Sequence, residues 1–354
     1  MPKILIIPGD GIGSEITIAA RKVLEQVDKK FSLSLTYERK DAGGFAFEKY
    51  GTPLPDETVD AALAADAVLF GAVGGPKWDY LKPELRPERA LFGLRKTLGL
   101  YANLRPVHVE ASLAEYSALR PEKVIGADFV IVRELTGGIY FGDRAEARVL
   151  NGIESAYDVE EYSAPEIERI ARVAFETAKI RRGKVTSVDK ANVLASSRLW
   201  RKTVERIAQR YPEVQLNHFY VDNCAMQIAA NPKQFDVILT NNIFGDILSD
   251  EAAVVGGSIG MMPSASIGEK TSFFEPIHGS APDIEGKGIA NPVGTILSAA
   301  MLLRYALHEE KAATAIEHAV SKALDEGWRT PDLWREGFKK AMTEDMTNAI
   351  VKNL

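Results

Sequence analysis

The chain has 354 residues, of which 46% are hydrophobic and 26% charged, with a formal net charge of −6; this length exceeds the usual size of one domain, so we expect two domains around large cores. The composition is typical of a globular protein rather than a disordered or fibrous one, and its mild acidity disfavours a nucleic-acid partner. One cysteine (Cys224), no secretion-signal pattern and no apolar run of roughly 20 residues predict a cytoplasmic protein with no internal disulfide and no membrane role.

The first part of the chain alternates strand and helix patterns. An apolar run at Lys3–Ile7 ends at Pro8 and Gly9. A helical pattern follows, whose apolar side chains share one face: Ile16, Ala20, Val23, Leu24 and Val27. We then expect a strand at Leu33–Tyr37, a helix at Pro55–Ala64 and a buried strand at Ala67–Val73. This alternation predicts an open α/β sheet.

The same alternation continues to the end of the chain. We expect strands at Phe129–Val132, Lys184–Val188 and Val237–Thr240, and helices at Pro165–Ile180, Ser197–Tyr211, Phe244–Val255, Val293–Leu307, Lys311–Asp325 and Thr343–Leu354. Ser197 is predicted to cap its helix, because a serine hydroxyl accepts a hydrogen bond from an unsatisfied N–H of the first turn. A long loop is expected at Glu275–Pro292, and no internal repeat or low-complexity linker interrupts the pattern.

Three glycines follow the first predicted strand and precede the first predicted helix. Gly9, Gly11 and Gly13 partly match the G-x-G-x-x-G fingerprint of dinucleotide-binding folds, but Ser14 occupies the sixth position. Missing side chains also suit a tight turn that approaches another loop, and this second interpretation is favoured. No glycine-rich loop of the Walker A type is present, so the sequence gives no support for phosphoryl transfer.

Two aspartates lie four residues apart in the predicted helix after Thr240. This spacing places Asp246 and Asp250 on one helical face, with β-carbons about 5 to 6 Å apart. Oxygen ligands without histidine or cysteine favour a hard cation such as Mg²⁺ or Mn²⁺. A solvated acidic face, or carboxylates that stabilise a helix N-terminus, also fits the spacing. Asp222 follows a predicted strand, where open α/β sheets place their sites, although it could equally cap the next helix.

Three arginines are candidate anion ligands. Arg95, Arg105 and Arg133 each carry a rigid guanidinium fork that suits a carboxylate, and Arg133 comes directly after an apolar strand. If they converge, they predict a dicarboxylate ligand. Each one alone is more often a partner in a surface ion pair, so their joint meaning depends on the fold.

Taken together, seven ordered motifs resemble those of the β-decarboxylating dehydrogenases of hydroxyacids, the isocitrate/isopropylmalate dehydrogenase family. The motifs are Pro8–Gly13, Gly71–Trp78, Leu94–Lys96 with Ala102–Pro106, Arg133–Gly142, Asp189–Val193, Asn241–Glu251, and His278–Asp283 with Ala290–Pro292. The resemblance covers essentially the whole chain. Departures from the family pattern are few, namely Ser14, Cys224 and Glu285, and none of them is a predicted ligand, although Glu285 lies beside the expected cofactor loop.

The resemblance implies a two-domain, open-sheet α/β fold that is not a Rossmann fold. Residues 1–100 and 253–354 would form a cofactor-binding domain, and residues 101–252 would bind substrate and metal and form a homodimer. Lys190 and Asp222 would reach into the active site of the partner. Asp246 and Asp250 of one subunit and Asp222 of the other would then hold the Mg²⁺ or Mn²⁺ ion.

The resemblance also implies the reaction, which is oxidative decarboxylation of a small 2-hydroxy diacid with reduction of NAD. Arg95, Arg105 and Arg133 would bind the two carboxylates of a malate backbone. Lys190 would take the hydroxyl proton, and Tyr140 would assist protonation of the enol. Without the resemblance, Lys190 would be taken for a surface residue and Tyr140 for an aromatic residue in a turn.

Specificity is expected from two segments. Leu91 and Phe92 offer apolar contact to an isopropyl group, which favours 3-isopropylmalate, a substrate of leucine biosynthesis, over isocitrate. Asp283 would accept hydrogen bonds from the adenosine ribose and repel an extra phosphate, so NAD is expected rather than NADP. The full set of predicted cofactor ligands is Gly75, Glu88, His278, Gly279, Ser280, Ala281, Pro282, Asp283, Ile284 and Asn291, with Glu88 also beside the substrate.

Three alternatives stay open from the sequence. The first is a related dehydrogenase of tartrate, malate or homoisocitrate. The second is a metal-dependent lyase or aldolase that uses no nicotinamide. The third is a carboxylate-binding protein without catalysis, which the missing export signal disfavours.

Overall fold

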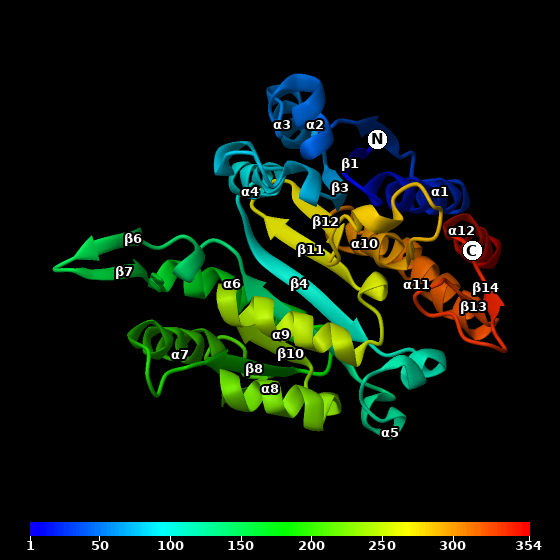
Figure 1. Cartoon of the computed structure of the whole chain (residues 1–354). Helices are drawn as coiled ribbons and strands as arrows, with labels where there is room; N and C mark the ends of the chain where they lie inside the picture. Colours follow the sequence, from blue (N-terminus) through cyan, green and yellow to red (C-terminus); the bar gives the residue numbers. More distant parts are fainter. The chain divides into compact units, whose positions relative to one another are not determined.

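The computed structural model describes residues 1–354, with the side chain of Leu150 left out. The chain divides into two compact units (Figure 1). Unit 1 comprises Met1–Leu100, Glu110–Ser117 and Gly256–Leu354, and unit 2 comprises Tyr101–Val109 and Ala118–Val255. Unit 1 is therefore built from both ends of the chain, and unit 2 from its middle.

Five mostly parallel strands of unit 1 lie side by side in the order β2-β1-β3-β12-β11. These strands are β1 (Lys3–Gly9), β2 (Thr36–Arg39), β3 (Ala67–Ala72), β11 (Pro263–Gly268) and β12 (Ser272–Pro276), with a separate short pair of β13 (Trp328–Arg329) and β14 (Lys339–Lys340). The first four strands in that order run parallel, and β11 runs antiparallel to β12. The predicted start of the second strand at Leu33 is wrong, because Ser32 and Ser34 adopt left-handed backbone conformations that interrupt an extended chain.

Helices cover these strands much as the apolar patterns predict. The longer ones are α1 (Gly13–Phe31), α10 (Val293–Tyr305), α11 (Glu310–Asp325) and α12 (Thr343–Asn353), and the shorter ones are α2 (Gly44–Tyr50), α3 (Asp56–Ala64) and α4 (Glu88–Thr97). The face of α1 predicted to be apolar is buried, since Ile16, Val23 and Val27 have no exposed surface. In the described part of the chain, no helix has the length and apolar character needed to span a membrane.

Five strands of unit 2 lie side by side in the order β4-β5-β10-β8-β9. These strands are β4 (Leu100–His108), β5 (Asp128–Glu134), β8 (Lys184–Asp189), β9 (Gln215–Tyr220) and β10 (Val237–Thr240). Strands β5, β10, β8 and β9 are parallel, and β4 is antiparallel to β5. Consequently the four parallel strands all end at one edge of the sheet.

Four helices pack on the strands of unit 2, and a short one, α5 (Pro121–Val124), precedes β5. Helices α6 (Ala164–Lys179) and α7 (Ala195–Ala208) pack together against β5, β10, β8 and β9, as do α8 (Val221–Ala230) and α9 (Asn242–Val255) as a second pair. The prediction that Ser197 caps its helix is wrong. Helix α7 begins two residues earlier, and the buried Ser197 hydroxyl accepts a hydrogen bond from the Lys190 backbone N–H at 3.0 Å.

An exposed hairpin is a part of unit 2 that the sequence did not predict, as are strand β4 and helix α5. Strands β6 (Arg144–Leu150) and β7 (Ile153–Asp158) pair antiparallel and project away from the other elements of unit 2 (Figure 1). Two of its apolar side chains, Val149 and Ile153, are each 69% exposed. Exposed apolar side chains of this kind are typical of a surface that binds a partner.

The glycine turn after β1 lies against a distant loop. Gly11 has a φ of +55°, and a β-carbon there would lie 2.0 Å from the carbonyl oxygen of Ser280. The next residue, Ile12, donates its backbone N–H to the same oxygen at 2.8 Å. The turn therefore needs glycine so that two backbone segments can meet, which is the second of the two interpretations above.

We expect Gly11→Ala to destabilise the protein more than Gly51→Ala. Gly51 also has positive φ, at +76°, but a β-carbon there would have no neighbour within 4 Å. Backbone strain alone should cost about 1 kcal/mol at either position, and the clash at Gly11 should add about 2 kcal/mol. Urea denaturation of the two variants and the wild type measures this difference, and equal losses would contradict the close contact.

Candidate active site

Predicted site residues of unit 2 gather at the carboxyl ends of its parallel strands. Arg133 is near the end of β5, Lys190 directly follows β8, and Asp222 lies in the first turn of α8 just after β9. Helix α9, which carries the two aspartates, begins just after β10. Open α/β sheets place their sites at this edge, so the fold brings these side chains to a suitable location.

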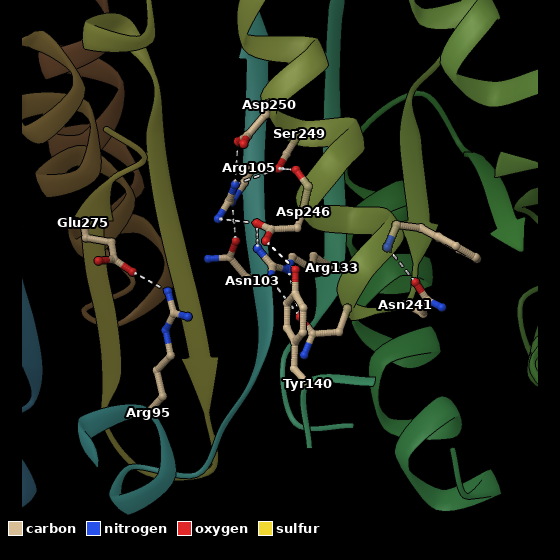
Figure 2. Close-up of polar contacts among 12 residues, drawn as sticks. Arg95, Asn103, Arg105, Arg133, Tyr140, Asn241, Asp246, Ser249, Asp250 and Glu275 are labelled. Atoms are coloured by element: carbon tan, nitrogen blue, oxygen red, sulfur yellow. Dashed lines mark hydrogen bonds and ion pairs between the residues drawn. The ribbon is translucent and has the colours of Figure 1, made fainter. Parts of the chain in front are cut away.

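Arg105 reaches α9 from the neighbouring strand β4 (Figure 2). Its guanidinium donates to the hydroxyl of Ser249 and to the amide oxygen of Asn103, each at 2.7 Å. It also lies 3.8 Å from the carboxylate of Asp246 and 3.5 Å from that of Asp250. One cation therefore contacts both aspartates, which confirms that they share one face of the helix.

Arg133 is the more deeply buried of the two arginines, with 5% of its side chain exposed. It donates twice to the amide oxygen of Asn242, at 3.1 and 2.8 Å, and it forms a close ion pair with Asp246. The amide nitrogen of Asn242 donates to the carbonyl oxygen of Gly137 at 3.2 Å. Asn242 thus fixes the direction in which the guanidinium points.

Tyr140 contacts the same aspartate. Its hydroxyl donates to the second carboxylate oxygen of Asp246 at 3.0 Å, and its ring lies 6.0 Å from the guanidinium of Arg133 (Figure 2). Partial burial and the negative charge of Asp246 raise the pKa of Tyr140, so its hydroxyl keeps its proton at neutral pH. The residue is therefore available as a proton donor.

Lys190 and Asp222 form a second, separate group. The ammonium of Lys190 donates to the carboxylate of Asp222 at 2.8 Å, and this hydrogen bond lowers the pKa of Asp222. Asp222 follows β9 and helix α9 follows β10, and two strand spacings, or roughly 10 Å, separate these two strands across the sheet. Among the residues that the structure describes, no three His, Cys, Asp or Glu side chains are close enough to hold one metal ion. Asp222 therefore does not join Asp246 and Asp250 within one chain.

The predicted cofactor residues lie in unit 1, most of them on the loop after β12, whereas Gly75 follows β3 and Glu88 begins α4. Asp283 lies in a short turn, Pro282–Ile284, and Ala281 and Ile284 pack against the core residues Ile12, Ile16 and Ala290. The Ser280 hydroxyl donates to the carbonyl oxygen of Gly74, next to Gly75, at 2.7 Å. This loop is thus anchored both to the start of α1 and to the segment after β3.

The other predicted ligands on this loop have defined environments. Burial lowers the pKa of His278, so its ring is neutral near pH 7, and the amide of Asn291 donates to the carboxylate of Asp332 at 3.1 Å. Gly279 has open space where a β-carbon would stand. These features leave room for a ligand beside Gly279, whereas Asn291 is part of the support of the loop.

Helix α4 carries the predicted specificity residues of unit 1. The Glu88 carboxylate lies against Gly74, where a β-carbon would be 2.7 Å from its oxygen, and Leu91 is half-buried. Phe92 is 47% exposed. Arg95 already binds a carboxylate, since it donates to Glu275 at 3.1 Å (Figure 2).

Several residues in these networks were missed by the sequence analysis. Asn242, Ser249 and Asn103 hold the two arginines, and Glu134, Glu160 and Tyr162 hold the loop that carries Tyr140. In unit 1, the buried carboxylate of Asp10 accepts backbone hydrogen bonds from Gly44, Phe45 and Gly74. The only signal for most of these residues was their place inside a motif, such as Asp10 within the glycine turn, and Glu160 and Tyr162 lie outside every motif.

Comparisons with known proteins cover nearly the whole chain. Residues 3–350 match the family model described as isocitrate/isopropylmalate dehydrogenase. The chain is 56% identical over 354 residues to 3-isopropylmalate dehydrogenase from Xanthomonas campestris pv. campestris, covering 99% of both chains. It is 57% identical over 354 residues to the enzyme of the same name from Pseudomonas savastanoi pv. phaseolicola, covering 99% of this chain and 98% of that one.

Solved structures give the same result at lower identity. An isocitrate dehydrogenase from Methylococcus capsulatus superimposes with a TM-score of 0.87 at 38% identity, covering 100% of this chain and 99% of that one. A β-decarboxylating dehydrogenase from Thermococcus kodakarensis superimposes with a TM-score of 0.83 at 40% identity, covering 100% and 96%. The similarity therefore extends over both units.

In metal-free protein, we expect Asp246→Asn to cost more stability than Asp250→Asn. Asp246 is the acidic partner of the buried Arg133, whereas Asp250 is 70% exposed and contacts only the edge of Arg105. Allowing for the 36% exposure of Asp246, its loss should cost about 1 to 2 kcal/mol, and the loss of Asp250 less than about 0.5 kcal/mol.

Denaturation in the presence of a chelator measures both variants against the wild type. The two substitutions are on the same helix and make the same chemical change, so each is the control for the other. Equal losses would contradict the unequal ion pairs.

Proposed function

The chain belongs to the isocitrate/isopropylmalate dehydrogenase family, and from that premise we propose that it is an NAD-dependent 3-isopropylmalate dehydrogenase of leucine biosynthesis. The enzyme oxidatively decarboxylates 3-isopropylmalate to 4-methyl-2-oxopentanoate and reduces NAD. The observation that carries the proposal is the 56–57% identity over almost the full chain to relatives with that name. The arginines and aspartates of unit 2 supply the groups that such a reaction requires.

Arg105 and Arg133 bind the carboxylates of the substrate. Both guanidinium groups face acidic oxygens at the carboxyl edge of the sheet, and both are held by neutral partners, Asn103 and Ser249 for the first and Asn242 for the second. These neutral partners keep the forks in place when their acidic partners change. Arg95, in unit 1, is proposed as a third ligand of the same diacid.

A divalent cation, Mg²⁺ or Mn²⁺, fits the residues on α9. Asp246 and Asp250 offer only oxygen atoms, which hard cations prefer, and the Asp250 carboxylate is mostly exposed. Two carboxylates do not complete an ion's coordination, and the third, Asp222, is with Lys190 at another place in the same chain. We therefore propose that Asp222 of a second chain completes the set.

NAD binds along the loop that follows β12. The anchored turn at Pro282–Ile284 presents Asp283, which accepts hydrogen bonds from a ribose, and the open space beside Gly279 admits the cofactor. Ser280 and His278 line the same loop, and Gly75 and Glu88 lie beside Gly74, to which Ser280 is hydrogen-bonded. A negative charge at Asp283 disfavours the additional phosphate of NADP.

The chain's own residues move the protons of the reaction. NAD, held by the loop after β12, would supply the hydride acceptor, and a divalent cation held by Asp246 and Asp250 would supply Lewis acidity toward the substrate oxygen. Lys190 takes the hydroxyl proton during oxidation. Tyr140, whose hydroxyl keeps its proton at neutral pH, supplies a proton to the enol that remains after carbon dioxide has left.

The active enzyme is a homodimer with shared active sites. Two observations support this: the separation of Lys190 and Asp222 from the α9 aspartates within one chain, and the exposed hairpin β6–β7 with its apolar side chains. Each site then combines the α9 aspartates of one subunit with Lys190 and Asp222 of the other. A cytoplasmic location stays a prediction.

The direct test is turnover of 3-isopropylmalate by the purified protein with NAD and Mn²⁺, followed by the absorbance of reduced nicotinamide. We expect saturable turnover that is abolished by a chelator, is weaker with NADP, and is absent or slow with isocitrate and tartrate. Turnover of isocitrate or tartrate without turnover of 3-isopropylmalate would refute the proposed substrate.

Mixed dimers test the shared site. A dimer of one Lys190→Ala chain and one Asp250→Asn chain, purified by two different tags, has one intact site and one doubly altered site. We expect it to regain about half of the wild-type turnover, although each homodimer is nearly inactive.

The control combines Lys190→Ala with Asp222→Asn. Both of these residues come from the same side of the shared site, so neither site of that mixed dimer is intact and turnover should stay low. Recovery of turnover in the control dimer, or no recovery of turnover in the first mixed dimer, would contradict the shared-site arrangement.

A further inference from the structure

The loop that carries Tyr140 is held by its backbone rather than by the tyrosine side chain. Tyr140 is 42% exposed, and its ring has a single charged neighbour, Arg133, among the described contacts. It lies at the end of a one-turn helix, Gly138–Tyr140, directly after β5 and before the exposed hairpin. The groups that hold this turn in place therefore also hold the Tyr140 hydroxyl near Asp246.

Two carboxylates accept hydrogen bonds from the backbone N–H groups of this loop. Glu134 accepts from Thr136 at 2.7 Å and from Gly137 at 2.8 Å. Glu160 accepts from Ile139, the residue before Tyr140, at 2.7 Å. Glu134 is on the same strand end as the loop, whereas Glu160 follows the hairpin and is 21 residues away from Ile139. Of these two carboxylates, Glu160 is thus the one that ties the turn to a different segment. It acts beside two further hydrogen bonds, from the Gly138 N–H to the carbonyl oxygen of Glu161 at 3.0 Å and from the Asn242 amide to the carbonyl oxygen of Gly137 at 3.2 Å.

The other oxygen of Glu160 holds the start of α9. The amide nitrogen of Asn241 donates to it at 2.8 Å. The amide oxygen of Asn241 in turn accepts from the backbone N–H of Phe244 at 2.9 Å, in the first turn of the helix that carries Asp246. Glu160 therefore bridges the turn with Tyr140 and the helix with Asp246, the two groups that meet in the 3.0 Å hydrogen bond.

Close packing shows that the bridge has little freedom. Gly138 has a φ of +75°, and a β-carbon there would lie 2.7 Å from the hydroxyl of Tyr162 and 3.1 Å from the carboxylate of Glu160. The Tyr162 hydroxyl accepts from the backbone N–H of Asn242 at 3.0 Å. The turn, Glu160 and the start of α9 thus form one contiguous hydrogen-bonded group.

Resting on the proposed function, we propose that Glu160 is a positioning residue for the reaction: it holds the Tyr140 hydroxyl in register with Asp246 by bridging Ile139 and Asn241. Glu160 contacts neither Tyr140 nor Asp246 through its side chain, so it acts through the backbone and not on the substrate. Misplacement of a proton donor by even 1 Å lowers the rate of its step. The arginines proposed to bind the substrate have partners of their own, Asn103 and Ser249 for Arg105 and Asn242 for Arg133.

Glu160→Gln keeps the shape of the side chain but breaks the bridge. A glutamine side chain has one acceptor, its oxygen, and one donor group, its NH2. In either orientation the NH2 group faces another donor, either the Ile139 N–H or the Asn241 amide nitrogen. We expect kcat to fall about tenfold with little change in the KM for 3-isopropylmalate or NAD. The matched control is Glu161→Gln, which makes the same change at the adjacent exposed glutamate and should leave kcat unchanged.

A second substitution should restore the bridge. The double variant Glu160→Gln/Asn241→Asp again pairs a donor with an acceptor, and the carboxylate at position 241 can still accept from the Phe244 N–H. We expect it to recover most of the lost kcat. A merely destabilised fold would not be rescued by this exchange.

Amide hydrogen exchange of the ligand-free protein gives a readout that does not need turnover. In Glu160→Gln, the peptide that spans residues 136–142 should exchange faster than in the wild type and in Glu161→Gln, and the double variant should regain protection. If the wild type turns over no 3-isopropylmalate, the proposed function fails while this readout still tests the bridge. Unchanged exchange in Glu160→Gln, wild-type kcat, or equal kcat in the single and double variants would overturn the assignment.

Discussion

The buried guanidinium of Arg133 is the constraint on which the rest of unit 2 depends. Two carboxylates four residues apart on an exposed helical face repel each other by only about 0.2 to 0.5 kcal/mol, so Asp246 and Asp250 could stand alone. A buried arginine that loses its partner costs several kcal/mol. Loss of the contacts between Arg133 and its partners Asp246 and Asn242 would therefore destabilise the arginine more than it would destabilise the aspartates. The start of α9 is placed where it can neutralise this charge.

This arrangement gives the proposed reaction a consistent charge balance. In the ligand-free protein, Asp246 accepts from Arg133 and Tyr140 and lies near Arg105. Under the proposed function, a substrate carboxylate would replace Asp246 as the partner of a guanidinium. A divalent cation would then replace the guanidinium as the partner of Asp246, so that every charge stays paired. Each replacement makes the other more favourable. Binding of the diacid and of the cation is then mutually favourable, as linkage requires.

The sequence predicted what depends on local pattern, and missed what depends on distant partners. Apolar periodicity correctly predicted β1, α1 and the helix with Asp246, because burial of one face follows directly from residue spacing. The partners of Arg133 could not be found in this way, since Asn242 is 109 residues away along the chain and Asp246 is 113. Ser197 shows the limit of local rules: its hydroxyl binds the Lys190 backbone N–H rather than the first turn of its own helix. Glu160 had no signal at all, because its role comes from the fold bringing the two ends of the hairpin together with α9.

Strand order also decides what one chain can do alone. With β10 and β8 between β5 and β9, Arg133 and the α9 aspartates belong to one half of the carboxyl edge, and Lys190 with Asp222 belongs to the other. A metal ion needs its oxygen ligands within about 2.0 to 2.6 Å, and no three His, Cys, Asp or Glu side chains of one chain lie close enough for this among the described residues. Under the proposed function a second copy supplies the missing half, and dimerisation is then part of the catalytic apparatus and not only a source of stability.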